Sequence, residues 1–97
     1  MNSMKSRFKK SEKIVSRKVA DEFILVPICR STKEVESIYT LNEVAARVWE
    51  LIDGKETMES ISDRIREEFE VSKEEAQYDI KELFDHFMEI NVIKKVD

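Results

Sequence analysis

The fold of this chain is decided in residues 38–54, which read IYTLNEVAARVWELIDG. Up to Leu41 the pattern alternates with the period of two that is typical of a β-strand, beginning at about residue 35. From residue 43 the apolar positions recur every three or four residues, which is the period of an α-helix. Either of two residues at this change can cap the helix: Thr40, which has Glu43 at capping-box spacing, or Asn42, itself a strong N-cap. Gly54 is typical of a helix end. We therefore predict a strand that leads directly into a helix.

Two further strands are predicted before this junction. Residues 14–19 alternate, residues 23–28 are apolar on both faces, and Ala20-Asp21-Glu22 separates them, a pattern that predicts a β-hairpin. The strand that is apolar on both faces is expected to be central in the sheet, with strand 35–41 at an edge. Residues 1–13 show no periodicity, so we expect a flexible basic tail there, followed by one domain over residues 14–97.

Two more helices are predicted after Gly54. Thr57 begins the first, whose apolar face is Met58, Ile61, Ile65 and Phe69. Ser72, followed by Glu75 at capping-box spacing, begins the second. That helix runs to about Asn91, which tolerates the left-handed conformation at a helix end. The predicted order βββααα is that of an α+β domain, a three-stranded antiparallel sheet followed by three helices.

Composition excludes several classes of protein. The chain has 97 residues, of which 41% are hydrophobic and 39% charged, with a net charge of −4. This is enough for one core, and the longest apolar run, residues 23–28, is far too short to span a membrane. A single cysteine, Cys29, excludes an internal disulfide and favours a reducing compartment, which we take to be the cytoplasm. We find no catalytic constellation and no metal-ligand or cofactor motif, so we expect a protein that is not an enzyme.

The last helix carries more apolar positions than packing on one neighbour requires. Its apolar residues cover about half of the helix circumference, against about 100° for a single buried stripe. Packing under two neighbours explains this width, and so does a wall of a binding groove. Strand 35–41, at the edge of the sheet, has Glu36 but no Lys or Pro to prevent another strand from pairing with it. An undefended edge beside an apolar helix favours the capture of an extended peptide.

The ordered set of these residues resembles the PqqD-like family of peptide chaperones, the recognition elements of ribosomally made, modified peptides (RiPPs). The resemblance covers residues 14–93, and the matching positions are Ile38 to Asn42, Ala45, Ala46, Val48 to Gly54, Thr57, Ile61, Glu75, Ala76, Asp79, Ile80, Leu83, Phe84, Phe87 and Asn91 to Ile93. The sequence departs from the family pattern at Asn91, where glycine is usual, and at the Ala20-Asp21 turn, which also lacks glycine.

The resemblance implies a winged helix-turn-helix-like fold that binds the leader of a precursor peptide and not DNA. The leader would add as an antiparallel strand to residues 35–41 and be presented to a modifying enzyme, such as a radical enzyme that uses S-adenosylmethionine, a leader protease or a cyclase. The residues that the resemblance places at the peptide are Glu36, Ser37, Ile38, Tyr39 and Thr40 on the strand, with Ala76, Asp79, Ile80, Leu83, Phe84 and Phe87 on the last helix. Leu83 and Phe87 are expected to be the main apolar anchors.

Two alternatives remain at this stage. A DNA-binding winged helix needs a basic recognition helix, whereas the last helix here has two lysines, Lys73 and Lys81, against six acidic residues. A self-associating module, a homodimer for example, would instead cover the free strand edge with a second copy of the chain. The sequence does not identify the precursor peptide, the modifying enzyme or the product, which could be pyrroloquinoline quinone, a lasso peptide or another modified peptide.

Overall fold

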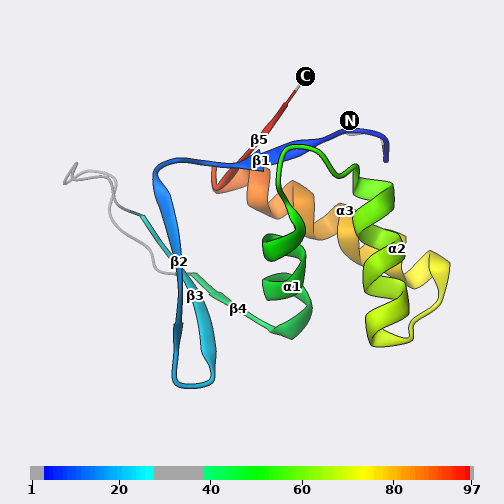
Figure 1. Cartoon of the computed structure of the whole chain (residues 1–97), viewed down its shortest axis with the longest axis horizontal. Coiled ribbons are helices and arrows are strands. Elements are labelled where there is room, and N and C mark those ends of the chain that lie inside the picture. Colours follow the sequence, from blue (N-terminus) through cyan, green and yellow to red (C-terminus); the bar gives the residue numbers. More distant parts are fainter. Residues whose placement is uncertain (1–3, 28–38, 97) are drawn as a thin grey trace.

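A computed structural model describes residues 4–27 and 39–96 of the chain (Figure 1). The predicted three-stranded antiparallel sheet followed by three helices is confirmed, and a second, two-stranded sheet is added to it. In chain order the elements are β1 (Phe8–Lys10), β2 (Ile14–Val19), β3 (Glu22–Pro27), β4 (Tyr39–Leu41), α1 (Glu43–Leu51), α2 (Met58–Phe69), α3 (Lys73–Glu89) and β5 (Ile93–Lys95).

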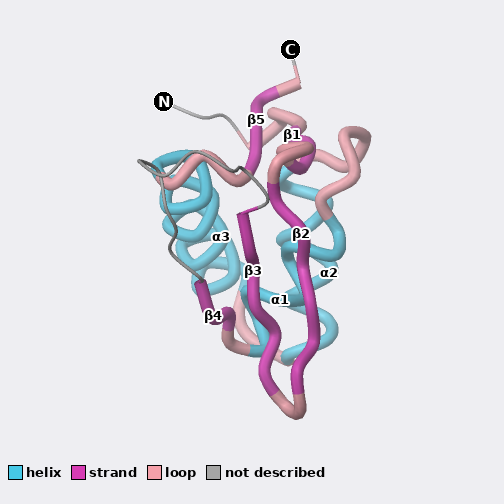
Figure 2. Tube along the Cα trace, turned by 90° about the vertical axis from the view of Figure 1, so that its left-hand side faces the viewer, coloured by secondary structure: helices cyan, strands magenta, loops and turns pink. Residues whose placement is uncertain are grey.

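Strands β2, β3 and β4 form the predicted meander, with β3 in the centre (Figure 2). The β2–β3 hairpin closes at the pair Val19 and Glu22, and Ala20 in its turn has a left-handed φ of 56°. A tight hairpin turn requires such a conformation, which normally favours Gly, Asn or Asp. Strand β4 is described only for Tyr39–Leu41, so residues 35–38 of the predicted third strand lie outside the described residues.

Each helix begins at a predicted cap, and of the two candidates for α1 the cap is Asn42 and not Thr40. The side chain of Asn42 accepts a hydrogen bond from the amide of Ala45 at 2.8 Å, and Thr57 and Ser72 cap α2 and α3 in the same way. These oxygens satisfy amides that have no partner within the helix. The end of α1 differs from the prediction, because the helix stops at Leu51. Gly54 has a φ of 85°, but it lies beyond the helix cap and donates its amide to the carbonyl of Phe8 at 2.8 Å.

Helix α3 ends in a Schellman motif that leads directly into β5. Asn91 adopts a φ of 61°. The amide of Val92 donates to the carbonyl of Phe87, and the amide of Asn91 donates to the carbonyl of Met88, both at 3.1 Å. The predicted left-handed role of Asn91 is therefore confirmed, and Asn in place of the usual Gly is accommodated. The chain turns sharply here, which brings Val92 and Ile93 into the core.

The expectation of a flexible tail over residues 1–13 is wrong for the part of that segment that the structure describes. Strand β1 pairs antiparallel with β5, the last strand of the domain, and Phe8 is only 1% exposed. Its ring meets that of Phe84 on α3 edge-to-face, with centroids 5.0 Å apart. The amide of Met58, at the start of α2, also donates to the carbonyl of Ser6 at 3.0 Å. The domain therefore begins before residue 14, and its first strand, β1, is hydrogen-bonded to its last strand, β5.

The core lies between the helices and both sheets, and α3 runs through its centre. Ala76, Ile80, Phe84 and Phe87 on α3 are completely buried. Phe84 packs on Phe8 of β1, while Phe87 meets Trp49 of α1 edge-to-face at 5.8 Å. The wide apolar face of α3 is thus explained by several neighbours around it. None of the helices in the described part of the chain is long and apolar enough to cross a membrane.

Candidate functional site

Strand β4 presents a free edge, because it pairs with β3 on one side and with no described strand on the other. Tyr39 and Leu41 are half-buried and pack against the core, whereas Thr40 between them is exposed. The unpaired amide and carbonyl groups of an edge strand can form a hydrogen-bonded ladder with an added strand. The edge of β4 is therefore one wall of a candidate site for an extended chain.

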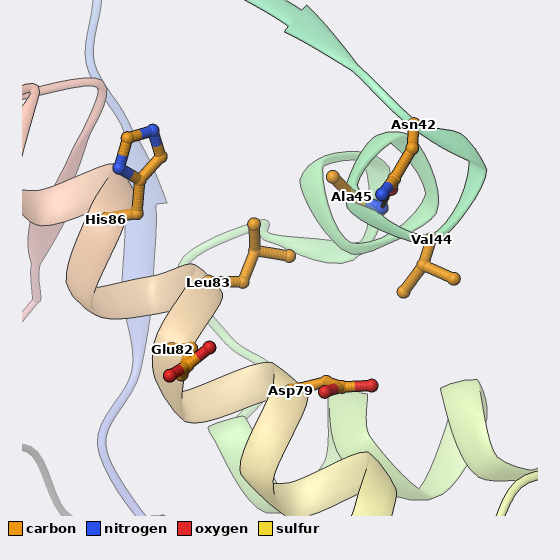
Figure 3. A pocket seen from close by; sticks show the side chains of 7 residues that line it. All are labelled: Asn42, Val44, Ala45, Asp79, Glu82, Leu83 and His86. Atoms are coloured by element: carbon orange, nitrogen blue, oxygen red, sulfur yellow. Dashed lines mark hydrogen bonds between the residues drawn. The ribbon is translucent and has the colours of Figure 1, made fainter.

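A pocket of about 390 Å³ begins where β4 ends and lies between the first turn of α1 and the exposed side of α3. In Figure 3, Leu83 projects from α3 into the space between the two helices, with Asp79 and His86 on either side of it along the helix. We call this hollow, together with the edge of β4, the edge groove. The residues that line its pocket are Asn42, Val44, Ala45, Asp79, Glu82, Leu83 and His86.

The edge groove combines apolar and acidic surface. Val44, Ala45 and Leu83 supply apolar surface, whereas Asp79 and Glu82 supply carboxylates. The hydroxyl of Tyr78, beside the groove, donates to Glu82 at 2.9 Å. This hydrogen bond and the charge of Glu82 raise the pKa of the Tyr78 hydroxyl, because both favour its protonated form. The groove therefore suits a partner that has apolar side chains and no negative charge facing α3.

Only part of the predicted site reaches the edge groove. Asp79 and Leu83 line the pocket, and Tyr39 and Thr40 lie on the β4 edge, as the resemblance implies. The structure contradicts a direct peptide contact for the other four predicted residues of α3, because their side chains are 0% exposed. These are Ala76, Ile80, Phe84 and Phe87. The predicted positions Glu36, Ser37 and Ile38 lie outside the described residues.

Helix α1 contributes to the site in a way that the sequence pattern does not predict. Val44 and Ala45 belong to the predicted core face of that helix, but both also line the pocket, together with the capping residue Asn42. On α3 the additional residues are Glu82 and His86. A signal for these two exists in the sequence, because positions 79, 82, 83 and 86 have the i, i+3, i+4, i+7 spacing of one helix face. A half-polar face of this kind is usually interpreted as solvated surface.

A second hollow, of about 630 Å³, lies across Asn42 from the edge groove, between the tip of the β2–β3 hairpin, α1 and the end of α2. Arg47 lines this hollow and forms ion pairs with Glu68 at 2.8 Å and with Glu50 at 3.3 Å. The guanidinium of Arg47 lowers the pKa of the Glu68 carboxyl through its hydrogen bond and its charge. None of the predicted site residues lines this hollow. The edge groove remains the candidate site.

Comparisons with known proteins identify a family and a similar fold. The family model of coenzyme PQQ synthesis protein D (PqqD) matches residues 32–93. The solved structure of TbiB1 in complex with the TbiA(beta) leader peptide is similar over 89% of this chain and 94% of its own, with a TM-score of 0.74 and 22% identity. At that identity the likeness shows a shared fold. No curated protein matches the chain.

Proposed function

The chain belongs to the PqqD family, and on this premise we propose that it captures the leader of a ribosomally made precursor peptide. The leader would add as a strand to β4 and lie against α3, in the edge groove. The free edge of β4 beside this groove is the observation that carries the proposal. The similar TbiB1 structure, which is a complex with a leader peptide, supports the same class of ligand.

Backbone pairing alone does not supply the affinity. A strand of six residues forms about four to six hydrogen bonds, each worth about 1 kcal/mol net. Ordering those residues costs about 1–2 kcal/mol each, so the two contributions roughly cancel. Buried apolar side chains, at about 1.5–3 kcal/mol each, must provide the remainder. Two or three of them give a dissociation constant between tenths of a micromolar and tens of micromolar, about −7 to −9 kcal/mol.

The apolar floor of the groove identifies the main anchor. Leu83 is half-buried and faces Val44 and Ala45 across the pocket, so a leader side chain placed there would be enclosed by both helices. Phe87, the second anchor expected from the sequence, is fully buried against Trp49. It would therefore influence leader binding only indirectly, through the packing of the core beneath the groove. Leu83 is therefore the side chain whose loss should weaken leader binding most directly.

The chemistry of maturation would belong to a partner. We propose that the bound leader is presented, in the cytoplasm, to a modifying enzyme such as a radical enzyme that uses S-adenosylmethionine, a leader protease or a cyclase. A DNA-binding role is disfavoured by the charge of α3. Its exposed acidic residues are Glu74, Glu75, Asp79, Glu82, Asp85 and Glu89, and phosphate would be repelled by them.

Titration of the ¹⁵N-labelled protein with the leader of a precursor encoded beside its gene tests the proposal. We expect amide shifts at Tyr39–Leu41 and around Asp79, Leu83 and His86, with micromolar affinity. Leu83→Ala should weaken binding about tenfold or more, because one buried apolar contact is lost. Leu51→Ala is the matched control, since Leu51 is also half-buried but lies outside both pockets.

Three results would count against the proposal. Equal binding by the Leu83 and Leu51 variants would exclude the edge groove as the site. An absence of shifts at millimolar leader would exclude leader binding by the isolated protein. Sedimentation of the free protein as a dimer that the leader does not dissociate would assign the β4 edge to a second copy of the chain.

A further inference from the structure

The side of α3 that faces the edge groove carries one sign of charge. At about 100° per residue, Asp79 lies about 40° from Leu83 around the helix, and Glu82 lies about 100° away in the same direction. Glu75 falls between these two, also exposed. The two lysines of the helix lie elsewhere, Lys73 on the other side of Leu83 and Lys81 nearly opposite to it. An incoming strand would therefore meet Asp79 and Glu82 beside Leu83, with His86 as the other polar residue of α3 in the groove.

These carboxylates have no cationic partner within the described part of the chain. The ion pairs there are those of Arg47 with Glu50 and Glu68, on the other side of α1. Glu82 accepts a hydrogen bond from the neutral hydroxyl of Tyr78, and the facing wall of the pocket offers Asn42, Val44 and Ala45, none of them charged. Asn42 already uses its side-chain oxygen to cap α1.

A docked leader would remove water from these carboxylates. Burying a carboxylate without a partner is costly, whereas a Lys or Arg placed against it restores its hydrogen bonds and its charge balance. A neutral or acidic leader segment would therefore lose affinity at this flank, and a basic one would gain it. The groove discriminates between leaders by the residue that they place beside Asp79 and Glu82.

The geometry sets the position of that residue. Asp79 and Leu83 are four residues apart on α3, a rise of about 6 Å. Side chains on one face of a strand repeat every two residues, at about 6.6–6.8 Å. Strand β4 and α3 lie along roughly the same line with opposite chain directions in both views (Figures 1 and 2), so a strand added antiparallel to β4 would run along α3. The distance from Asp79 to Leu83 along the helix then matches the spacing of alternate side chains on the added strand.

We infer that the leader carries a Lys or Arg two positions from the apolar residue that docks on Leu83, and that Asp79 and Glu82 select it. This inference rests on the proposed function and adds a charge requirement to it. The contact is a salt bridge that becomes partly desolvated when the leader binds. It should weaken binding about five- to thirtyfold when broken, and its effect should diminish at high salt.

Charge reversal on both partners tests the inference. We expect Asp79→Lys to weaken binding of the native leader about tenfold, and a leader whose Lys or Arg is replaced by Glu to restore it. Asp63→Lys is the matched control, because it changes the net charge equally and Asp63 is an exposed residue of α2 that lines neither pocket. It should leave the affinity for the native leader within about twofold. Calorimetry at low and high salt measures the affinity of both variants for the leader and its dependence on salt.

The outcomes separate this inference from the proposed function. If the wild-type protein binds the leader but Asp79→Lys, Glu82→Lys and the reversed leader all leave affinity within twofold, the charge selection is wrong while leader binding stands. A bound leader without Lys or Arg at that spacing overturns the inference in the same way. If the wild-type protein binds neither the native leader nor the charge-reversed leader, the charge selection and the proposed function are both overturned.

Discussion

Removing the side chain of Phe8 tests the most unexpected feature of the fold, the packing of the first strand on the last helix. Phe8 is 1% exposed, and its ring lies 5.0 Å from that of Phe84 at an interplanar angle of 63°. Replacing a buried Phe by Ala costs about 3–5 kcal/mol, which includes about 0.5–1.5 kcal/mol for the edge-to-face contact. Strand β1 has only three residues, so its detachment limits the loss, and we expect about 3 kcal/mol for Phe8→Ala.

Urea unfolding followed by circular dichroism measures this loss. With a slope of about 1–2 kcal/mol per molar, the midpoint should fall by about 1.5–3 M. Phe8→Leu, which keeps most of the apolar volume, should cost only about 1 kcal/mol. Lys9→Ala is the control in the same strand, because Lys9 is exposed and should change stability by less than about 0.5 kcal/mol.

Amide exchange gives a local reading of the same contact. The amide of Gly54 donates to the carbonyl of Phe8, and that of Met58 donates to the carbonyl of Ser6. Both amides should exchange faster in Phe8→Ala, because the strand that protects them is released. A Phe8→Ala protein as stable as Lys9→Ala, with unchanged exchange at Gly54, would refute the packing of β1 and restore the flexible tail.

Three further predictions concern single residues. Asn42→Ala should lower the free energy of unfolding by about 1 kcal/mol, because it removes the cap of α1; thermal unfolding measures it. Ala20→Gly should raise that free energy by about 0.5–1 kcal/mol, since φ at Ala20 is 56°; an unchanged or lower urea midpoint would contradict this. Arg47→Gln should return the pKa of Glu68 towards its ordinary value of 4.5 in an NMR titration. The pair stabilises the fold above that value, and its contribution is lost as the pH falls through the lower folded pKa.

The elements that depend on neighbours in the sequence are predictable from it. The caps at Asn42, Thr57 and Ser72 follow from side chains that accept the backbone amide three residues further on. The left-handed Asn91 follows from backbone hydrogen bonds within the last turn of α3. The hairpin around Ala20 is equally local. Such interactions depend on the residue types themselves, so a pattern of a few residues is enough to identify them.

Strand β1 is not predictable in this way, because its cause is not local. It contains a single apolar residue, Phe8, followed by two lysines, and so has no period for a strand prediction to detect. Its order comes from partners some eighty residues away in the chain. Strand β5 pairs with its backbone, and the ring of Phe84 meets that of Phe8. A three-residue strand is stable only when such partners are already in place.

The sequence by itself determined the helices, the hairpin, the central place of β3 and the amphipathic character of α3. Only the tertiary structure decided which side of α3 is buried and which faces the edge groove. Leu83, Phe84 and Phe87 are all apolar, yet the two phenylalanines are enclosed by β1 and α1 while Leu83 stays half-exposed. The physical reason is that periodicity records how much of a helix avoids water, whereas the identity of the covering surface depends on contacts between distant segments.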